Sequence, residues 1–465
     1  MARVIISGGR VVCGTGTFKA DLLVENEKIA AIGKAKGFGR ADRTIDATGM
    51  IVLPGLIDVH VHFLEPFMGT VSLQDFFTGT RAAAFGGVTT VIDFAHQEKG
   101  KSLAEAIERR REQADGHVVI DYGLHVGVTD PTRATLSEVE NVIKSGVPSF
   151  KVYTIYRDEG LMLDDGALLA LLQETRRHGG LVIVHAENAF VTEYRQRVYL
   201  DHGKTSAPYH ALSRPNVVEE EAIQRVALLA RFAKAPFYIV HLSTREGVGI
   251  IGRNKAEGFP AFAETCTHYL CLTDEVYDRA DGIHYIISPP LRKKQDMTAL
   301  WEGLADGSLS VVSSDDISFS NEAKLMGKDS FDRVPNGMPG VELRLPVLFS
   351  EGFRKGRITL ERLVEITSTN PSRLFGLFPQ KGVIQVGSDA DLVILDPTKE
   401  VVLGKDTLHM VADFCCLEGM KVRGYPVVTM SRGKVIVEDG RFLGKEGDGR
   451  FLERKIDLKG LRNLR

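Results

Sequence analysis

The hydrophobic pattern divides the chain into a long central part and two ends of a different kind. Between residues 56 and 314, short hydrophobic runs recur, and segments with helical spacing separate them. Runs that are hydrophobic on both faces indicate strands covered on both sides, and their alternation with helices indicates a parallel sheet. The runs are residues 56–62, 88–94, 118–128, 150–156, 181–186, 237–242, 261–268 and 309–314, and the helical spacing is clearest at residues 103–113, 136–144, 166–177, 217–233 and 245–256. Eight such units predict an α/β fold, a (β/α)8 barrel of the TIM type.

Both ends of the chain show short β-prone runs separated by glycine-rich turns. No helical period is sustained in residues 1–53, and Pro54 and Gly55 then interrupt the chain. The β pattern returns after about residue 376. We therefore expect one small β-sandwich domain formed by residues 1–53 and 377–445, with the barrel, residues 54–376, inserted between them. The charged tail, residues 446–465, is not needed to finish either domain, and we expect it to contact a neighbouring subunit of a homo-oligomer, a tetramer or a dimer.

Composition narrows the function classes. The 465 residues are 43% hydrophobic and 26% charged, with a net charge of -3 and no long run of like charge, so no nucleic-acid partner is expected. The five cysteines form no CxxC pair, which fits a reducing compartment. The N-terminal hydrophobic run is too short for a signal peptide, and no stretch approaches the roughly 20 hydrophobic residues that span a bilayer. We expect a cytoplasmic protein with no membrane partner.

The sharpest chemical signal is a pair of histidines at the end of the first predicted barrel strand. His60 and His62 are two residues apart, so on a strand both side chains point to the same side. In an arbitrary protein such a pair is usually a coincidence. Active sites of (β/α)8 barrels, however, gather at the C-terminal ends of the strands, and neutral imidazole is a good ligand for zinc-like ions. The pair therefore predicts a metal site.

Three further metal-capable residues end other predicted strands. His185, His241 and Asp315 follow the runs that begin at residues 181, 237 and 309. Each alone would be read as a hydrogen-bonded core residue or a cap. Together with the histidine pair they place five potential ligands at one face of the barrel, which favours a metal centre over five independent structural roles.

Lys151 is the unusual member of this set because it lies within a hydrophobic strand. A buried lysine is disfavoured unless it is paired or neutral. One interpretation is a lysine whose ammonium reaches solvent at the barrel rim. The other is a neutral amine that reacts with carbon dioxide to give a carbamate, an anionic oxygen ligand that can bridge two cations.

These residues carry a resemblance that extends over nearly the whole chain. The chain resembles the cyclic amidohydrolases of the amidohydrolase superfamily, most closely the hydantoinases and dihydropyrimidinases. The matching segments are PGLIDVHVH (54–62), DFFTGTRAAA (75–84), SFKV (149–152), VHAEN (184–188), VHLS (240–243), ETC (264–266), SPPLR (288–292), NGMPGVE (336–342) and GSDADLV (387–393). In combination these motifs are specific.

The resemblance implies a centre of two divalent metal ions per chain, with zinc as the expected metal. One ion would be held by His60, His62 and Asp315. The other would be held by His185 and His241, and an N6-carboxylated Lys151 would bridge the two.

Catalytic and substrate-binding roles follow from the same resemblance. Asp315 would also take a proton from the attacking water and deliver it to the leaving nitrogen. Tyr156, five residues after the lysine, would stabilise the oxyanion, and backbone groups of Ser288 and Asn336 would hydrogen bond the ring amide of the substrate. Without the resemblance, Tyr156 would be read as packing, and Ser288 and Asn336 as turn residues next to proline or glycine.

Two positions depart from related subfamilies. Dihydroorotases and allantoinases commonly have arginine two residues after the second histidine of the pair, whereas Leu64 stands there in this chain. Leucine cannot bind a carboxylate as a guanidinium does, so we expect a neutral substrate ring and place Leu64 in the substrate site. Second, Asp315 is followed by Asp316 rather than the His-Cys of many hydantoinases.

The predicted function is the metal-dependent hydrolysis of a cyclic amide or ureide to an N-carbamoyl amino acid. Hydantoin, 5-substituted hydantoins and dihydropyrimidines are the expected substrates, and Leu64, Phe67, Phe94 and Tyr153 are expected near the ring substituent. Allantoinase activity is the alternative within this class. A non-catalytic dihydropyrimidinase-like assembly protein is the alternative of another class, and it is disfavoured because all six ligand positions are filled.

Overall fold

Eight parallel strands form the centre of the larger domain in the computed structural model, which describes residues 3–14 and 16–464. Residues 1, 2, 15 and 465, which fall in the predicted terminal segments, lie outside the described part. In sheet order the strands are β17 (Val311–Ser313), β16 (Ala261–Cys266), β15 (Phe237–Ile239), β14 (Leu181–His185), β13 (Ser149–Tyr153), β12 (Asp121–Gly127), β11 (Val88–His96) and β8 (Leu56–Asp58). A bridge between Val61 and Asp316 joins the two outer strands beyond their ends. The predicted barrel is thereby confirmed.

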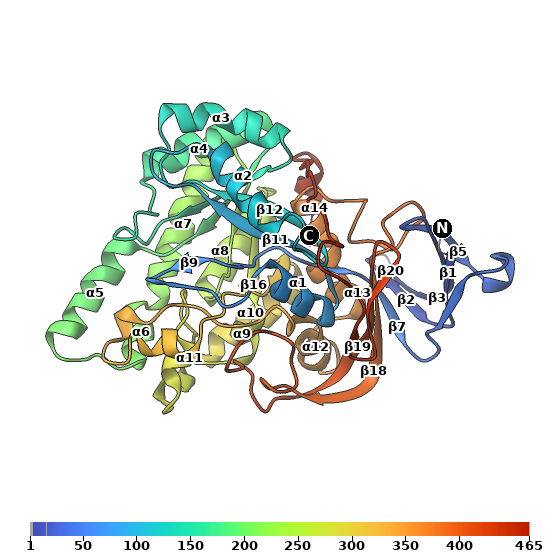
Figure 1. Cartoon of the computed structure of the whole chain (residues 1–465). Helices are drawn as coiled ribbons and strands as arrows, with labels where there is room; N and C mark the ends of the chain where they lie inside the picture. Colours follow the sequence, from blue (N-terminus) through green and yellow to red (C-terminus); the bar gives the residue numbers. More distant parts are fainter. Residues whose placement is uncertain (1–2, 15, 465) are drawn as a thin grey trace.

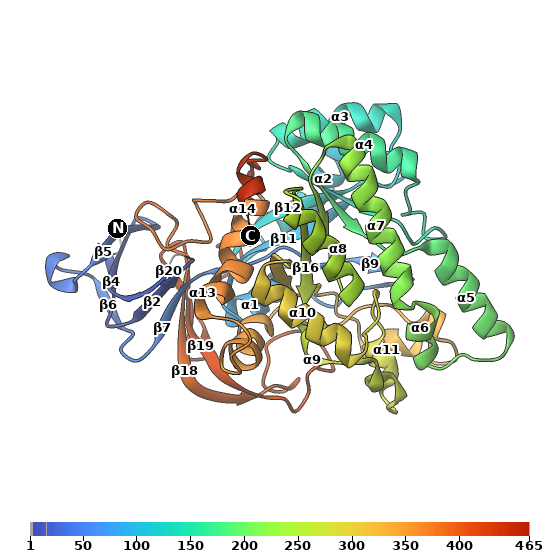
Figure 2. The same ribbon diagram turned by 180° about the vertical axis from the view of Figure 1, so that it is seen from behind.

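Helices surround the outside of this barrel, as Figures 1 and 2 show from opposite sides. The longer ones are α1 (Phe76–Phe85), α2 (Leu103–Ala114), α3 (Arg133–Lys144), α4 (Asp165–His178), α5 (Ala189–Asp201), α7 (Asn216–Ala233), α8 (Arg245–Ala256) and α10 (Lys294–Asp306). The shorter ones are α6 (Pro208–Ser213), α9 (Thr267–Cys271), α11 (Asn321–Leu325), α12 (Arg344–Val347), α13 (Leu360–Val364) and α14 (Asn370–Leu374). The local sequence determines where several helices begin. Ser102 and Glu105, for example, form a capping box at the N-terminus of α2. In the described part of the chain, no helix is both long and hydrophobic enough to cross a membrane.

Several barrel strands are shorter than the hydrophobic runs predicted. The run at residues 56–62 is a strand only over β8, and the run at residues 237–242 only over β15. The residues that follow leave the hydrogen-bonded ladder because their backbone turns: φ is 37° at His241 and 51° at Asp315. Left-handed φ is uncommon for residues other than glycine and is found at functional sites. The change of backbone direction after the strand ends therefore sets the directions of the side chains at this end of the barrel.

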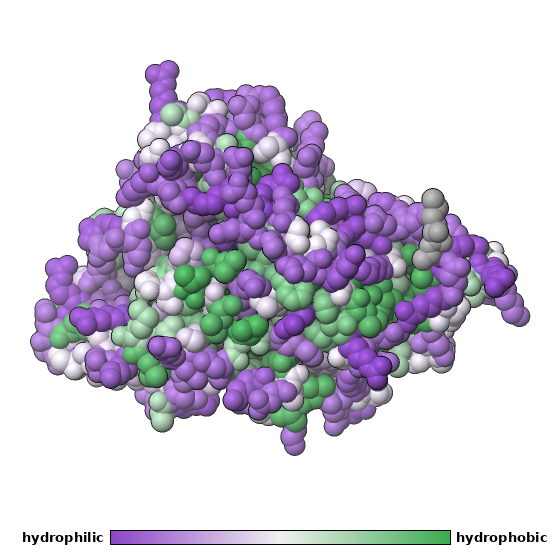
Figure 3. All heavy atoms as spheres, in the orientation of Figure 1, coloured by the Kyte–Doolittle hydropathy of each residue, from purple (hydrophilic) through white to green (hydrophobic). Residues whose placement is uncertain are grey.

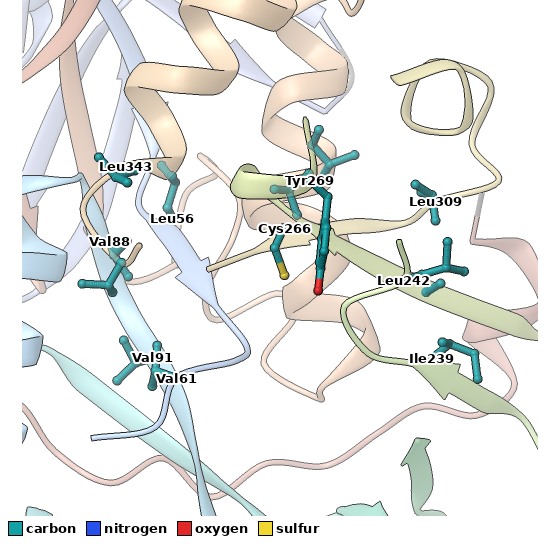
Figure 4. Packing of buried hydrophobic residues seen from close by; sticks show 14 of the residues in the cluster. Leu56, Val61, Val88, Val91, Ile239, Leu242, Cys266, Tyr269, Leu309 and Leu343 are labelled. Atoms are coloured by element: carbon teal, nitrogen blue, oxygen red, sulfur yellow. The ribbon is translucent and has the colours of Figure 1, made fainter. Parts of the chain in front are cut away.

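The barrel strands are held in place by a large hydrophobic core between sheet and helices. Figure 4 shows part of it, with Leu56, Val88 and Ile239 from three barrel strands in one cluster with Leu242 and Leu309. All five side chains are at most 1% exposed. Burying one such side chain contributes roughly 1.5–3 kcal/mol, so the strand positions are firmly set. A rigid frame of this kind can hold loop residues in a fixed arrangement at its C-terminal end.

The smaller domain is a β-sandwich built from both ends of the chain (Figure 1). One sheet has the order β5 (Lys28–Gly33), β4 (Asp21–Glu25), β1 (Arg3–Ser7), β6 (Arg43–Asp46), and the other has the order β21 (Arg441–Phe442), β20 (Lys434–Glu438), β19 (Lys421–Ser431), β18 (Leu392–Val402), β7 (Ile51–Pro54), β2 (Arg10–Cys13), β3 (Gly16–Lys19). Leu53 of β7 pairs with Val393 of β18, which joins the N-terminal and C-terminal pieces in one sheet. Gly55 connects β7 to the barrel, and no larger residue fits there because a Cβ would lie 2.1 Å from Oγ1 of Thr89. The predicted second domain is therefore present as a β-sandwich.

A buried ion cluster joins the two domains. Nζ of Lys381 lies 2.8 Å from Oδ2 of Asp121 in the barrel and 3.2 Å from Asp389, which precedes β18. Asp391 also binds this ammonium. The three carboxylates are close enough to suggest a metal site, but Lys381 already supplies the cation. The cluster is a domain contact.

The C-terminal tail lies on the barrel of its own chain, unlike the expectation that neither domain needs it. Leu452 and Ile456 are buried in one hydrophobic cluster with Leu181 and Val311, the first residues of two barrel strands. The fully buried Arg454 donates a 3.1 Å hydrogen bond to Ser149 Oγ in β13. The sequence did not reveal this role because the hydrophobic residues of the tail alternate with charged ones. The tail completes the barrel core.

Candidate metal centre

A cavity of about 240 Å³ opens at the C-terminal ends of the barrel strands. It is lined on its inner side by His60, His62, Lys151, His185, His241 and Asp315. Residues from β13 and β14 and from the segments after β8, β15 and β17 therefore meet in one place. This face is where active sites of such barrels lie.

His60 and His62 both face Asp315. Nε2 of His60 lies 3.2 Å and Nε2 of His62 lies 3.6 Å from Oδ1 of Asp315. Nδ1 of His60 is hydrogen bonded to Glu264, whose other oxygen accepts a 2.8 Å hydrogen bond from the hydroxyl of Tyr238. Glu264 therefore orients His60 so that its second nitrogen points toward Asp315.

His185 and His241 lie next to each other in the same cavity. Their ring centroids are 4.4 Å apart, and the ring of His241 is 5.4 Å from that of His60. Nε2 of His185 is 2.7 Å from Oε2 of Glu187. Lys151 is 1% exposed, and its Nζ lies 5.0 Å from the ring centroids of both Phe94 and Tyr153. The lysine is therefore enclosed by rings and does not reach solvent.

Burial sets the protonation of these groups. It lowers the pKa of His60, His62 and His241 well below the ordinary value, so their imidazoles are neutral at pH 7 and can act as ligands. Burial also lowers the pKa of Lys151, against the attraction of Asp315 and other carboxylates. A larger neutral fraction of the amine follows, and the neutral amine is the form that reacts with carbon dioxide.

The side chains present fit a metal ion. Of the buried nitrogens in residues 3–14 and 16–464, His60 Nε2 and His241 Nδ1 are among those without a hydrogen-bond partner. Leaving a buried polar atom unpaired costs about 1–3 kcal/mol, so each such nitrogen calls for a ligand. Ligand atoms of His60, His241 and Asp315 all lie within 4.8 Å of one another. This compact group contains members of both ligand sets that the resemblance implies.

Comparisons with known proteins agree with this geometry. The model of the Amidohydrolase family matches residues 51–436. A D-hydantoinase from Ralstonia pickettii is 45% identical over 455 residues, which are 97% of this chain and 99% of the relative, and an Escherichia coli D-phenylhydantoinase is 43% identical over 456 residues (97% and 98%). The crystal structure of dihydropyrimidinase from Brevibacillus agri NCHU1002 superimposes with a TM-score of 0.96 at 42% identity and covers 97% of this chain and 99% of that chain.

The chain belongs to the amidohydrolase family.

The lining of this amidohydrolase cavity also contains the other predicted residues. Tyr156, Ser288 and Asn336 line it, and Asn336 Nδ2 donates a 3.0 Å hydrogen bond to Ser288 Oγ. Burial raises the pKa of Tyr156, so it remains a phenol that can donate a proton in a hydrogen bond. Its backbone has φ of 64°, which a sequence pattern does not reveal.

Two of the residues expected near the ring substituent lie elsewhere. Leu64 is not among the residues that line the cavity; it is partly buried and packs against the main core. Its φ of 49° turns the backbone, so side-chain parity along the strand does not continue to this position. Phe94 is buried beneath the site, 4.5 Å from the ring of His62. Phe67 and Tyr153 do line the cavity.

Phe67 reaches the cavity from a small hairpin at its mouth. The hairpin consists of β9 (Pro66–Phe67) and β10 (Thr70–Val71), and both residues of its turn have positive φ, 47° at Met68 and 80° at Gly69. The ring of Phe67 packs edge-on against Tyr156 at 5.4 Å. On the face shown in Figure 3, hydrophobic residues gather around β9. The mouth is therefore partly hydrophobic.

Asp316 is a structural carboxylate. It is fully buried and accepts hydrogen bonds from the backbone N–H groups of Gly340 and Val341, at 2.7 and 2.9 Å. Gln74 donates a third, at 2.6 Å. Asp316 thereby fixes the segment after Asn336, and the departure from the His-Cys pattern does not place a further acid among the cavity-lining residues.

Sequence reasoning missed two buried carboxylates that orient histidines of the cavity. Glu264 binds His60, and Glu187 binds His185 while it accepts a 3.0 Å hydrogen bond from Arg214. Partners of this kind fix the orientation of a ligand histidine and tune a metal site. A signal was present: Glu264 is a charged residue within a hydrophobic strand, the same anomaly that singled out Lys151.

Proposed function

We propose that this amidohydrolase opens the ring of a neutral cyclic amide or ureide and releases an N-carbamoyl amino acid. Hydantoin and 5-substituted hydantoins are the leading substrates, and dihydropyrimidines such as dihydrouracil come next. The observation that carries the proposal is one cavity in which four buried histidines, Asp315 and Lys151 face the phenol of Tyr156. The D-hydantoinase and D-phenylhydantoinase relatives support the same class of reaction.

The ligand residues would hold two divalent ions, and zinc is the proposed metal because neutral imidazole and carboxylate are ligands that it takes. His60, His62 and Asp315 form one ligand set, and His185 and His241 form the other. When bound, such ions polarise a carbonyl and lower the pKa of an attacking water. The unpaired nitrogens of His60 and His241 support this use of the site.

Lys151 would complete the centre as a carbamate. Its neutral amine attacks carbon dioxide, a C–N bond forms, and one proton is released to solvent. The product is an anion with two oxygens in place of a buried cation. The ring-lined, desolvated position of Lys151 supports this modification, since burial favours the unprotonated amine.

Asp315 and Tyr156 would carry out the proton and charge chemistry. The carboxylate of Asp315 lies at the inner end of the cavity, where it can accept a proton from the attacking water and pass it to the leaving ring nitrogen. The phenol of Tyr156 would donate a hydrogen bond to the oxygen on which negative charge develops. Backbone groups at Ser288 and Asn336 would bind the ring amide at the far side of the cavity.

A substrate screen tests this function. The metal-loaded enzyme is mixed with hydantoin, a 5-substituted hydantoin, dihydrouracil, allantoin and dihydroorotate, and ring opening is followed by ultraviolet absorbance. We expect hydantoins and dihydrouracil to be hydrolysed and dihydroorotate to be poor. Activity on allantoin alone would establish the alternative within the class, and no hydrolysis of any ring by the metal-loaded protein would support the non-catalytic alternative.

Asp315→Asn tests the chemical step. Asparagine can still offer an oxygen ligand but cannot accept the proton. We expect kcat to fall by about 100-fold or more, since a positioned base contributes roughly 10²–10⁴. Metal analysis of the same sample separates this loss from loss of metal; an unchanged kcat with metal bound would assign the base to another residue.

We also propose that the enzyme is a homo-oligomer, a tetramer or a dimer. One face of α5 exposes Phe190, Tyr194 and Val198, which are spaced four residues apart. The side chains of the first two are 60% and 66% exposed. Exposed hydrophobic patches mark interaction surfaces. Sedimentation of the wild type should give a closed oligomer, and Phe190→Ser with Tyr194→Ser should shift it toward monomer; a monomeric wild type at micromolar concentration would reject the proposal.

A further inference from the structure

The outer part of the cavity is lined by two chemically different sets of residues, which we call walls. The hydrophobic wall consists of Pro66, Phe67, Leu161 and Ile317. The polar wall consists of Glu65, His96, Gln97, Glu98, Arg109 and Tyr153. The reacting carbonyl must lie at the inner end, next to Asp315, and the ring amide at Ser288 and Asn336. The substituent of the ring is then directed to the outer part, between these walls.

Three side chains of the polar wall form a connected series from the inner end to the mouth. The hydroxyl of Tyr153 is 2.8 Å from Nε2 of His96, and Nδ1 of His96 is 3.0 Å from Oε1 of Glu65. His96 therefore contacts Tyr153 with one ring nitrogen and Glu65 with the other. Glu65 is held in place, with its side chain 13% exposed at the cavity.

The arginines near Glu65 make their closer contacts with other carboxylates. Burial raises the pKa of Glu65, but His96 and Arg110 lower it further, and the net result is below the ordinary value. Arg110 is 3.6 Å from Glu65 but makes its closer contacts with Asp93, including a 2.7 Å hydrogen bond from Nε. Arg109 is paired with Glu98 at 2.5 Å. Neither arginine therefore has Glu65 as its nearest carboxylate.

We propose that this amidohydrolase prefers 5-substituted hydantoins whose substituent carries a cationic group, and that Glu65, positioned by His96 and Tyr153, is the residue that recognises it. The inference rests on the proposed function, because it requires a hydantoin ring at the inner end of the cavity. Glu65 would also account for the expected poor hydrolysis of anionic substrates such as dihydroorotate. A carboxylate in the cavity wall disfavours an anionic substituent, so Leu64 is not needed for this preference.

Three hydantoins of similar length test the inference: 5-(3-aminopropyl)hydantoin, 5-butylhydantoin and 5-(2-carboxyethyl)hydantoin. One charge-assisted contact to a partly buried carboxylate corresponds to a change of roughly 10- to 150-fold. We expect kcat/KM of the wild type to be about tenfold or more higher for the aminopropyl than for the butyl compound, and lowest for the carboxyethyl compound. This series needs no variant and so does not depend on any variant folding.

Glu65→Gln then tests the residue. It keeps the shape of the side chain and removes its charge, so the ratio of aminopropyl to butyl kcat/KM should fall toward one. Glu108→Gln is the matched control: it removes one negative charge from an exposed position on α2, the helix that carries Arg109, and should leave the ratio unchanged. An unchanged ratio in Glu65→Gln would overturn the role of Glu65.

The remaining outcomes separate the inference from the proposed function. If butylhydantoin is hydrolysed but the aminopropyl compound is no better, the inference is wrong and the proposed function stands. A preference for the carboxyethyl compound would likewise reject the inference. If none of the three hydantoins is opened by metal-loaded enzyme, the inference is wrong, and the proposed function is rejected with it only if dihydrouracil is not opened either.

Discussion

The carboxylate of Glu264 is hydrogen bonded to Nδ1 of His60, although Glu264 lies in β16, next to one end of the sheet order, and His60 follows β8 at the other end. The same carboxylate accepts a 3.2 Å hydrogen bond from the backbone N–H of His241. One buried acid therefore orients two of the histidines that line the cavity. Burial raises the pKa of Glu264 to about 7. The hydrogen bonds from these donors oppose this effect and favour the ionised carboxylate.

Glu264→Gln should weaken metal binding. Glutamine keeps the shape but cannot accept hydrogen bonds with both terminal atoms, so His60 loses its fixed orientation. Loss of such a partner typically costs 10–100-fold in metal affinity, and we expect a change of about that size in a competition with a chromogenic chelator. Glu257→Gln, at an exposed position, is the control. Equal affinity in Glu264→Gln and wild type would show that Glu264 does not support the centre.

Lys151→Ala should lose both metal and activity. The substitution removes the only lysine among the residues that line the cavity, and with it the proposed carbamate. We expect metal analysis to show fewer than two ions per chain, and turnover to be abolished. Lys144→Ala, in the exposed last turn of α3, should retain both. Reconstitution of the wild type without bicarbonate should be slow; a Lys151→Ala protein with two ions and full turnover would exclude the carbamate.

The barrel and the inner half of the site could be predicted because their signals are local. A hydrophobic run is visible wherever a strand is buried on both faces, and His60 and His62 are neighbours in sequence. The roles of Glu264 and Glu65 could not be predicted in the same way. Each depends on a contact between residues far apart in the chain: closure of the barrel brings Glu264 to His60, and the pairing of β8 with β11 brings Glu65 to His96.

Backbone conformation accounts for a second group of differences between the predicted and the observed directions of side chains. The side-chain alternation of a strand predicts which way a residue points only while the strand continues. At Leu64 and Tyr156 the backbone is left-handed, with φ of 49° and 64°, and their side chains go to different places: one to the core and the other to the cavity. In the hydrophobic pattern of the sequence, both are hydrophobic residues near a strand end, so the pattern cannot distinguish their directions.

Lys255 should make stability depend on pH. Burial, reinforced by Arg362, lowers its pKa to about 7, although its ammonium donates hydrogen bonds to Gly307 O and Ser310 Oγ at 2.7 and 2.8 Å. Between that value and the ordinary 10.5, the unfolded chain binds more protons than the folded one, so this residue's contribution to stability rises with pH and is lost as pH falls. Relative to Lys255→Met, we expect the wild type to gain about 1–3 kcal/mol in free energy of unfolding between about pH 7 and 10, measured with urea. A constant difference across this range would contradict the prediction.

Lys324 should control substrate affinity from a distance. Its ammonium, fully buried, donates to the carbonyl oxygens of Ile286 and Pro335 at 2.8 and 2.7 Å, and so ties together the segments that carry Ser288 and Asn336. Lys324→Met removes both donors and leaves two buried carbonyls unpaired, at a cost of about 1–3 kcal/mol each, so the two segments should move apart. Because these segments are proposed to bind the ring amide and not to move the proton, we expect KM for hydantoin to rise by about tenfold or more while kcat changes less. Lys328→Met, at an exposed position in the turn that follows α11, should leave both constants unchanged. Thermal unfolding of Lys324→Met shows whether the fold persists; a folded variant with wild-type KM would mean that the two segments hold their positions without the lysine.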